Sequence, residues 1–542
     1  MRSKAYWARN NLAQLHGETV SAVENRRSIS SRIVSKSNQK HLSAMSARVR
    51  SPEFPPQFPW LNTDRPLTLK SFKGRVVLLD FWTYCCINCL HVLPDLKYLE
   101  RKYRDSLTVI GVHSAKFDNE KEIENIRQAI LRYDIEHPVI VDRDFEVWEQ
   151  YAVRAWPTIV VIDPQGYCIG HVAGEGNREA LDEAIADLLQ QHQNQGTTDF
   201  QAIPFTLEKQ TQPLTTPLAF PGKVLADETT NRLFIADTGH HRIVVATLEG
   251  EVLHVIGTGN AGLADGSFDT AQFFAPQGMA WDGKHQLLYI ADTENHALRQ
   301  IDFTRQEVST IAGTGKQRDR FSPESGEALE VPLNSPWDIV LIEDILLVAM
   351  AGCHQIWGMD LGDRTIGIYA GSGGESCIDG TLDEAAFAQP SGLATDGTEL
   401  FVADSETSSI RGVGLEEDAI VRTLCGSGEL FGFGDVDGTG EAVRLQHCLG
   451  VEYAAGWLWV ADTYNHKIKQ VNPQTGFCQT VLGTGEDFRE PSGLSVAGSN
   501  LYIADTNHHR ICRVDLEIVK IEEWVLPGLC APQMCVPDRN GY

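Results

Sequence analysis

The sequence lacks any long hydrophobic run. None of its 542 residues fall in a stretch approaching the eighteen or more apolar residues that a membrane-spanning helix needs. Apolar residues make up 42% and charged residues 22% of the chain, which are ordinary values for globular proteins. A chain of this length exceeds what one hydrophobic core organises. We therefore expect a soluble protein of two or three domains, with no membrane partner.

Basic charge is scarce beyond the first fifty residues. The net charge is −27, but residues 1–50 contain ten Lys/Arg against two Glu, so the remaining 492 residues carry −35. Such a field repels a phosphate backbone, which argues against a nucleic-acid partner. Residues 1–50 also lack an apolar segment followed by a small-residue cleavage site, so they are not a secretory signal. We expect a disordered basic leader, possessing a second candidate start at Met45; an organelle transit peptide is the alternative.

Several chemical motifs are also missing. There is no nucleophile elbow, phosphate loop or dinucleotide fingerprint, which excludes the common hydrolase and nucleotide-binding signatures. Nine of the twelve cysteines are scattered singly, unlike the cysteines of a small disulfide scaffold. With no signal peptide, this favours a reducing cytoplasm. We expect no cofactor and no metal.

Three cysteines stand close together in "LLDFWTYCCINCLHVLPDL", where an apolar strand passes into a helix. Cys86 and Cys89 form a C-x-x-C pair, and Cys86 falls at or near the helix N-terminus. The unpaired amides and the positive end of the helix dipole favour a thiolate there. Asp80 lies six residues earlier at the end of the strand, where a buried carboxylate can exchange a proton with the second thiol. The sequence predicts that Cys86 is the nucleophile, that Cys89 is the resolving thiol and that Asp80 assists proton transfer to or from Cys89.

The surrounding pattern alternates strands and helices as far as residue 192. Strands are expected at 76–81, 107–112, 139–141, 158–162 and 168–172, and helices at 87–103, 119–133 and 177–191, the last two capped by Asn119 and Asn177. The phrase "WPT", Trp156 to Thr158, precedes the fourth strand and suits a cis peptide that docks a substrate backbone. Together with "DFWTYCCINC", these features resemble the thioredoxin fold.

Two departures from the thioredoxin pattern leave alternatives open. Cys85 stands where thioredoxins commonly carry Trp, and Ile87-Asn88 replaces Gly-Pro, adding no positive charge to favour the thiolate. The motif is therefore a redox dithiol or an inactive thioredoxin-like binding fold. A zinc site is disfavoured because His91 is the only further ligand nearby, and Cys530 and Cys535 lie at the far end of the chain. Cys85 is either a packing residue or an accessory thiol.

After the polar linker "QQHQNQGTTDFQ", one phrase returns six times. It reads "LFIADTGHHRI", "LYIADTENHAL", "LLVAMAGCHQI", "LFVADSETSSI", "LWVADTYNHKI" and "LYIADTNHHRI", with Asp or Met at positions 237, 292, 350, 404, 462 and 505. Short strands and Gly turns that recur at this spacing are typical of propeller blades. The sequence predicts a six-bladed β-propeller, with "IPFTLEKQ" near Thr206 and "EIVKIEEWVL" near Trp524 as candidate strands that close the ring.

Histidines four residues after the repeated position suggest a second site at first sight. A residue that repeats once per blade is more economically a packing or hydrogen-bonding element, and we assign these histidines and the preceding Asp to blade structure. Met350 and Ser408 break the pattern, either as functional surface or as drift. Acidic inserts such as "DGSFDTAQF" lack the ligand spacing of a calcium loop.

The order of domains and the repeated phrase resemble the NHL-repeat-containing protein 2 family over residues 55–526. The resemblance rests on "FWTYCCINCLHVLPDL", "IGVHSAKFDNEK", "FPGKV" and "IADTGHHRI". It implies a multidomain chain, an α/β thioredoxin-like domain followed by an all-β propeller of six NHL blades. It also implies a bacterial-type member without the C-terminal β-sandwich of animal members. The expected boundaries are 1–50 leader, 51–192 thioredoxin-like domain, 193–205 linker, 206–527 propeller and 528–542 tail.

The expected function is thiol-disulfide exchange by Cys86 and Cys89, which would form the redox-active disulfide. Trp156, Pro157 and Thr158 would help to dock a protein or small disulfide, and the propeller would recruit a protein partner. The competing hypothesis is a non-enzymatic scaffold built on a redox-inactive fold. A propeller enzyme with a metal in its channel is a third hypothesis. We expect a monomer.

Overall fold

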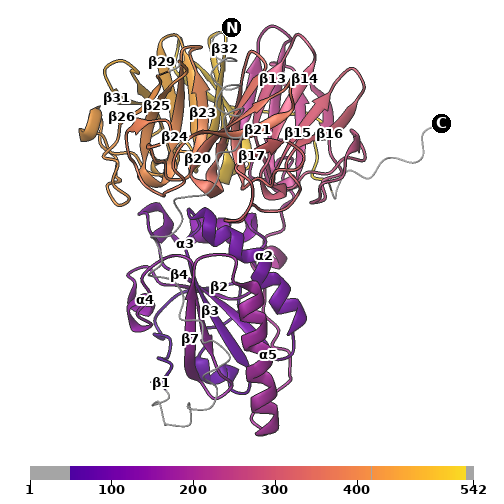
Figure 1. Cartoon of the computed structure of the whole chain (residues 1–542), viewed down its shortest axis with the longest axis vertical. Coiled ribbons are helices and arrows are strands. Elements are labelled where there is room, and N and C mark those ends of the chain that lie inside the picture. The colour runs from indigo at the N-terminus through magenta and orange to yellow at the C-terminus, as the bar shows by residue number, and fades with distance from the viewer. Residues whose placement is uncertain (1–48, 417, 533–542) are drawn as a thin grey trace, which may run out of the picture.

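The computed structural model describes residues 49–416 and 418–532, which form two domains stacked on each other (Figure 1). The first domain is built on one mixed sheet with the strand order β1-β7-β6-β3-β4-β5-β2. Strands β3, β4 and β5 are parallel; β6 runs antiparallel to β3, and β7 runs antiparallel to β6. The strands are β1 Val49–Arg50, β2 Trp60–Leu61, β3 Val76–Trp82, β4 Leu107–His113, β5 Val139–Val141, β6 Thr158–Ile162 and β7 Tyr167–Ala173.

Helices α2 and α5 cover one face of this sheet. Val92, Leu96 and Leu99 of α2 and Leu181, Ile185 and Leu188 of α5 pack on Val76 and Leu78. The full set of helices in this part is η1 Leu69–Phe72, α2 Ile87–Lys102, η2 Asn119–Lys121, α3 Ile123–Arg132, α4 Glu146–Gln150, α5 Arg178–Asn194 and α6 Glu208–Thr211. Pro94 lies inside α2. The thioredoxin-like α/β class expected from the alternating pattern is confirmed.

Of three expectations at element ends, two are wrong, and the N-cap at Asn177 is confirmed. Asn119 does not cap α3, because residues 119–121 form the separate 3₁₀ turn η2 and Glu122 is the N-cap. Asn177 is the N-cap of α5, but its side chain makes no capping hydrogen bond. At the start of the chain, Val49 and Arg50 do not belong to a leader; they pair with Cys168 and Tyr167 as an edge strand. The rest of the expected leader, residues 1–48, and residues 533–542 of the expected tail lie outside the described residues.

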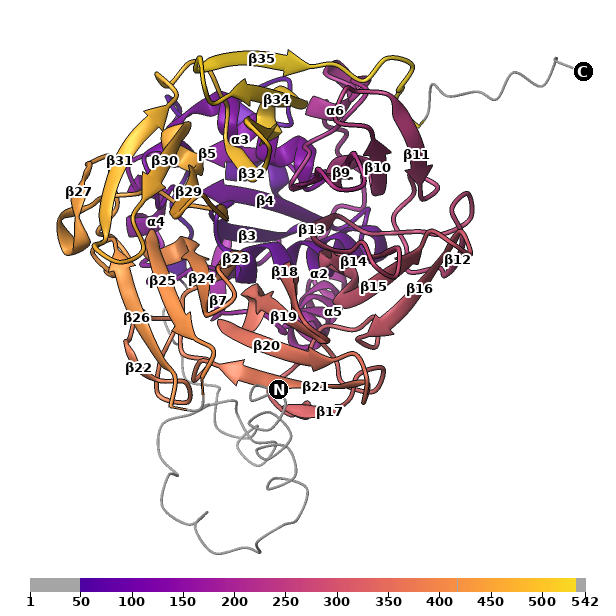
Figure 2. The ribbon, with the colours of Figure 1, turned by 90° about the horizontal axis from the view of Figure 1, so that it is seen from above.

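The second domain is a ring of six antiparallel sheets within the described residues, seen end-on in Figure 2. Blade 1 is β8 Val224–Asp227, β9 Arg232–Asp237, β10 Arg242–Ala246 and β11 Val252–Ile256; blade 2 is β12 Gly266–Ser267, β13 Pro276–Asp282, β14 Leu287–Asp292, β15 Ala297–Asp302 and β16 Glu307–Ala312; blade 3 is β17 Ser325–Glu327, β18 Pro336–Ile342, β19 Ile345–Met350, β20 Gln355–Asp360 and β21 Thr365–Ala370. Blade 4 is β22 Gly380–Thr381, β23 Pro390–Thr395, β24 Glu399–Asp404, β25 Ser409–Gly414 and β26 Ile420–Cys425; blade 5 is β27 Gly438–Thr439, β28 Gly450–Ala454, β29 Trp457–Asp462, β30 Lys467–Val471 and β31 Phe477–Leu482; blade 6 is β32 Pro491–Ala497, β33 Asn500–Asp505, β34 Arg510–Asp515 and β35 Lys520–Trp524. The six-bladed propeller is confirmed.

The ring closes differently from the expectation. Each blade consists of consecutive strands, so no blade combines strands from both ends of the propeller. The segment near Thr206 forms helix α6, whose Glu208 binds Asn62 and Arg127 of the thioredoxin-like domain. The propeller strands therefore begin at Val224, later than the expected boundary at residue 206. Blades 1 and 6 close the ring by packing apolar side chains, among them Leu233, Val244, Tyr502, Ile511 and Trp524.

A buried lysine, Lys223, links several blades at the centre of the ring. Lys223 Nζ donates hydrogen bonds to Asp338 Oδ2 of blade 3 at 2.8 Å and to the carbonyl oxygens of Ser391 and Leu449 at 3.0 and 2.8 Å. The glycines of the repeated turns allow the inner strands to come this close. A Cβ atom at Gly493, for example, would stand 2.5 Å from the Cα of Lys223. The axis of the propeller is thus filled by ionic and backbone contacts that link opposite blades.

The repeated phrase forms the same 3₁₀ turn in every blade, and its two recurring polar residues tie the ring together. The turns are η3 Thr238–His240, η4 Thr293–Asn295, η5 Ala351–Cys353, η6 Ser405–Thr407, η8 Thr463–Asn465 and η9 Thr506–His508, with η7 Gly440–Ala442 elsewhere in blade 5. The blade aspartates each accept a backbone N–H at 2.7 Å. Each histidine accepts a backbone N–H of the next blade, at 3.0–3.2 Å. The structural assignment of these residues is confirmed.

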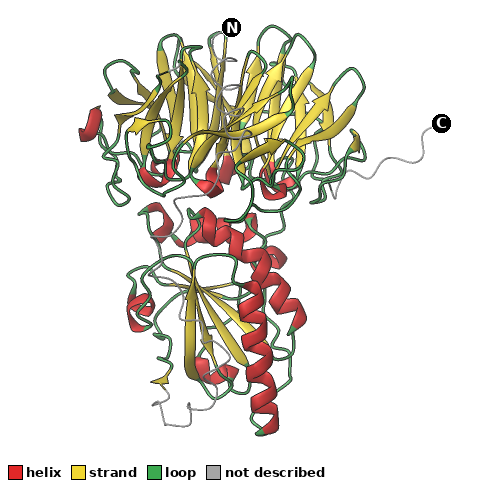
Figure 3. Ribbon diagram, viewed as in Figure 1, coloured by secondary structure: helices red, strands yellow, loops and turns green. Residues whose placement is uncertain are grey.

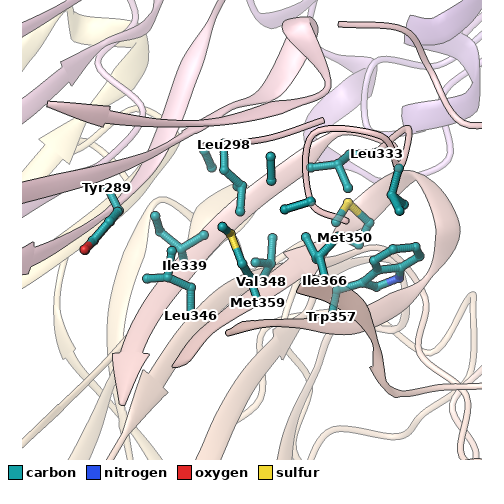
Figure 4. Packing of buried hydrophobic residues seen from close by; sticks show 14 of the residues in the cluster. Tyr289, Leu298, Leu333, Ile339, Leu346, Val348, Met350, Trp357, Met359 and Ile366 are labelled. Atoms are coloured by element: carbon teal, nitrogen blue, oxygen red, sulfur yellow. The ribbon is translucent and has the colours of Figure 1, made fainter. Parts of the chain in front are cut away.

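The two breaks in the pattern have a physical explanation. Ser408 takes the place of a histidine and still accepts the His447 N–H of the next blade at 3.0 Å. Met350 takes the place of an aspartate, and seven residues on, Trp357 takes the place of the arginine that pairs with that aspartate in blades 2 and 4. Met350 and Trp357 are both fully buried in one apolar cluster (Figure 4). Blade 3 has therefore exchanged a buried ion pair for apolar packing, a change that buried sites tolerate when both partners are replaced.

Candidate dithiol site

The two thiols of the C-x-x-C pair occupy unequal positions. Cys86 is the N-cap of α2, and its Sγ accepts the backbone N–H of Cys89 at 3.3 Å. Cys86 is half-buried, whereas Cys89 is 1% exposed. Burial, followed by the hydrogen bond and charge interaction with Cys86, raises the pKa of the Cys89 thiol well above its usual value. At neutral pH, Cys89 is therefore a thiol that must lose its proton before it can react.

Asp80 lies in β3 under the same helix and is 1% exposed. Neither of its carboxyl oxygens has a hydrogen-bond partner among the described residues. Burial raises the pKa of Asp80 to about 7, an effect that the charge of His137 opposes. Asp80 in turn contributes to the raised pKa of Cys89. A carboxyl group that titrates near neutral pH beside a protonated thiol has the properties of a general acid–base.

The "WPT" segment begins β6, beside the strand that carries Asp80. The peptide bond between Trp156 and Pro157 is cis, and Thr158 pairs with Phe81 of β3. Thr158 is buried and donates its hydroxyl to the carbonyl oxygen of Ala155 at 2.7 Å. Trp156 packs on Trp148 with a centroid separation of 4.6 Å. The fold thus brings this segment to the strand next to the dithiol, and its role in docking substrate stays a prediction.

Cys85 is buried, and its backbone is bound by the side chain of Glu120. Its N–H donates to Glu120 Oε1 at 2.9 Å, and burial followed by the charge of Glu120 raises its pKa well above the usual value. Glu120 also accepts the backbone N–H groups of Lys116 and Phe117, at 3.0 and 2.9 Å. The sequence analysis missed Glu120, although it lies in the "FDNEK" segment that carries the family resemblance. A carboxylate that gathers three backbone donors fixes the loop on which the cysteines stand.

The propeller covers the end of the thioredoxin-like domain that carries the dithiol (Figure 3). Gln389 of blade 4 accepts the N–H of Ile87 at 2.9 Å and donates to the carbonyl oxygen of Cys85 at 2.9 Å. Ile87 itself is buried with Leu90 against Trp337 and Ala351 of blade 3. One propeller side chain therefore binds the backbone on both sides of Cys86, a contact that sequence reasoning had no means to find.

Buried charges strengthen this interface. Lys116 forms an ion pair with Glu406 of blade 4, and both side chains are almost fully buried. Arg132 of α3 pairs with Glu490 at 3.0 Å, and Tyr84 donates its hydroxyl to the same carboxylate at 3.2 Å. Removing one member of a buried pair is costly because the other is left without compensation. The two domains are thus joined by specific contacts around the dithiol.

A cavity of about 1030 Å³ lies between the two domains. Its wall includes Tyr84, Cys85, Leu90 and His137 from the first domain and Trp337 from the second. The described residues contain no group of three or more His, Cys, Asp or Glu side chains placed to hold a metal ion. In the same part of the chain, no helix has the length and apolar character to cross a membrane.

The fold and the site define a class of protein: a thioredoxin-like domain with a C-x-x-C motif, docked on a six-bladed propeller. A family model described as thioredoxin-like matches residues 74–168. The chain is 43% identical over 534 residues to NHL repeat-containing protein 2 of Bos taurus, covering 88% of this chain and 73% of that protein. The chain belongs to the NHL repeat-containing protein 2 family.

Two further relatives differ from this chain in extent. Protein SUPPRESSOR OF QUENCHING 1, chloroplastic, of Arabidopsis thaliana is 45% identical over 492 residues, which are 86% of this chain but 46% of that protein. The chain thus spans about half the length of that relative. The thiol-disulfide oxidoreductase ResA of Bacillus cereus is 31% identical over 121 residues, 22% of this chain and 68% of that protein. This relative, named as a thiol-disulfide oxidoreductase, therefore matches less than a quarter of this chain.

Proposed function

We propose that this protein is a thiol-disulfide oxidoreductase of thioredoxin type that acts on a protein or small disulfide. The observation that carries the proposal is the position of Cys86 at the N-cap of α2, half-exposed above a buried Cys89 and the buried Asp80. Cys86 is the more accessible of the two thiols, and the unequal burial of Cys86 and Cys89 separates nucleophile from resolving group. The likeness to ResA supports the same assignment.

The exchange proceeds in two steps. The Cys86 thiolate attacks the substrate disulfide, forming a mixed disulfide and releasing one substrate thiolate. The Cys89 thiol then gives its proton to Asp80, and the Cys89 thiolate attacks Cys86 Sγ, which releases the second substrate thiolate and leaves a Cys86–Cys89 disulfide. Two electrons pass from the protein dithiol to the substrate. A dithiol reductant of the cell returns the protein to its reduced form by the reverse exchange.

In this proposal the propeller selects the substrate or a protein partner. Its loops contact the backbone beside the dithiol, and the interdomain cavity, which Cys85 lines, offers room for an extended segment or a small disulfide. The second candidate function is a non-enzymatic scaffold. It is favoured by the Gln389 contacts, which bind the backbone on both sides of Cys86 and hold the motif against the propeller.

A trapping experiment separates the two functions. Cys89→Ser stops the resolving step, so an oxidoreductase should accumulate mixed disulfides with cell proteins through Cys86. The matched control is the Cys86→Ser/Cys89→Ser double variant, in which these species should disappear. Reduction of insulin by the wild-type protein gives an independent measurement. The scaffold would be favoured if Cys89→Ser traps nothing and the wild type reduces neither insulin nor a small disulfide.

A further inference from the structure

Asp80 lies in a row of paired residues that crosses three neighbouring strands. Asp80 of β3 pairs with Gly111 of β4, and Gly111 pairs with Val139 of β5. Neighbouring strands lie about 4.8 Å apart, so these positions adjoin each other on the face covered by α2. Gly111 places no side chain between its neighbours. The space over Gly111 is therefore taken up by side chains of neighbouring residues.

His137 is one of three side chains that reach this place, together with Trp82 and Val139. It lies two residues before Val139, and its Nε2 would stand 3.4 Å from a Cβ atom at Gly111. Its backbone carbonyl is fixed by Asn62 Nδ2 at 3.0 Å. The His137 side chain is 4% exposed, and neither ring nitrogen has a hydrogen-bond partner among the described residues. A buried imidazole thus lies over Gly111, the residue that pairs with Asp80 on the neighbouring strand.

Glu100 of α2 is the carboxyl group that pairs with His137. Its Oε1 lies 3.5 Å from His137 Nδ1, and its side chain is one-quarter exposed. Both Glu100 and His137 line the interdomain cavity. A carboxylate at this distance favours the charged imidazolium, and the imidazolium in turn favours the ionised form of the next carboxyl. The order along the face is Asp80, His137 and Glu100.

We propose that His137, held in its charged form by Glu100, is a positioning residue that keeps Asp80 ionised, so that Asp80 can accept the Cys89 proton during the resolving step. This inference rests on the proposed function. In this step the Cys89 S–H bond breaks, the proton moves to an Asp80 carboxyl oxygen, and the Cys89 thiolate breaks the bond between Cys86 and the substrate sulfur. His137 changes neither bonds nor redox state; it acts through Asp80 alone.

The charged groups around Asp80 support the proposed effect of His137, which is to lower the pKa of Asp80. Burial raises the pKa of Asp80, His137 lowers it and Glu100 raises it. The pKa of His137 is lowered by burial and raised by Glu100, Asp80 and Glu136, with a net rise. Cys89 is the remaining titratable neighbour, and Asp80 raises its pKa. Without the positive charge at His137, Asp80 should ionise at a higher pH.

The test uses the two phases of the reaction between the full-length reduced protein and 5,5′-dithiobis(2-nitrobenzoic acid). The first thionitrobenzoate is released by Cys86 and the second by Cys89, so stopped-flow absorbance separates the two steps. His137→Gln should leave the first rate within twofold and move the pH midpoint of the second upward by about one unit, a roughly tenfold loss in the rising limb. The matched control is His192→Gln, since His192 is an equally buried histidine with a carboxylate, Asp163, at 3.6 Å. Its two phases should match the wild type.

Two further measurements distinguish a failure of this inference from a failure of the proposed function. Infrared difference spectra between each protein and its Asp80→Asn counterpart report the protonation of Asp80, even in a protein that exchanges no disulfides. Absence of exchange in the wild type would therefore overturn the proposed function, whereas an unmoved Asp80 midpoint in folded His137→Gln would overturn this inference. If His137→Gln does not fold, Glu100→Gln tests the same pair. The imidazole NMR titration of His137 should then fall by about one pH unit, and an unchanged titration would overturn the inference.

Discussion

Gln389 of the propeller accepts the backbone N–H of Ile87 at 2.9 Å, at the first residue of the helix that follows Cys86. The same amide donates to the carbonyl oxygen of Cys85. Free amides at a helix N-terminus stabilise a neighbouring thiolate, and here one of them is taken by the second domain. The propeller therefore takes part in setting the environment of the dithiol.

Replacing Gln389 by Ala should release the cysteine loop. The Ile87 N–H and the Cys85 carbonyl would lose their buried partners, at a cost of about 1–3 kcal/mol each. We expect a lower thermal unfolding temperature and an alkylation of Cys86 by iodoacetamide at least threefold faster than in the wild type. Gln474→Ala is the control, because Gln474 lies exposed in an outer turn of blade 5. Unchanged alkylation and unfolding in Gln389→Ala would show that the contact does not restrain the loop.

The interface ion pair offers a second prediction. Glu406→Leu leaves Lys116 buried without its carboxylate and should destabilise the protein by about 3–5 kcal/mol. Lys116→Met/Glu406→Leu replaces both charges by apolar groups and should recover most of this loss. Urea unfolding followed by tryptophan fluorescence measures both variants. Equal destabilisation by the single and the double variant would mean that the charges themselves contribute little.

The same logic applies within blade 3. Met350→Asp restores the residue of the other blades but places a carboxylate next to Trp357, without the arginine that blades 2 and 4 supply. We expect a loss of roughly 3 kcal/mol or more, since a buried charge without a partner is costly. Met350→Asp/Trp357→Arg rebuilds the pair and should unfold at a higher temperature than Met350→Asp. If the second substitution gives no recovery, the residues at positions 350 and 357 are not energetically coupled.

Local patterns predicted most of the architecture. Strands β3 to β7 match the expected ranges within about one residue, because continuous apolar runs between helical segments leave few alternatives. The two-residue strands β1 and β2 were not expected. The six blades were evident from the repeated "IADT" phrase. In every blade, the strand that carries this phrase is buried on both faces. The role of the repeated histidines also followed, because a residue present in most blades serves the blade.

The contacts between domains were beyond the reach of sequence patterns. Gln389, Glu406 and Glu490 meet the thioredoxin-like domain over sequence separations of about 290 to 406 residues, and no periodicity encodes such pairs. His137 and Glu100 were missed for a related reason, since a lone buried histidine has no motif. The ring closure was misjudged because the strand-like composition near Thr206 was outweighed by the contacts of Glu208 with Asn62 and Arg127.

The titration of Asp80 predicts how stability depends on pH. Its pKa is about 7 in the folded protein against 3.8 for an unperturbed Asp, so between these values the folded state binds more protons than the unfolded state. This group therefore favours the folded state at acidic pH, and the contribution is lost as the pH rises from about 4 through 7. Asp80→Asn removes the titration and should be more stable than the wild type at pH 8, by on the order of 3–4 kcal/mol, with the difference vanishing near pH 4. Thermal unfolding across this pH range measures the effect, with the exposed Asp383→Asn as control. A constant difference between Asp80→Asn and wild type would show that Asp80 ionises in the folded protein as it does in the unfolded chain, and its carboxylate would then be too weak a base to take the proton of the Cys89 thiol.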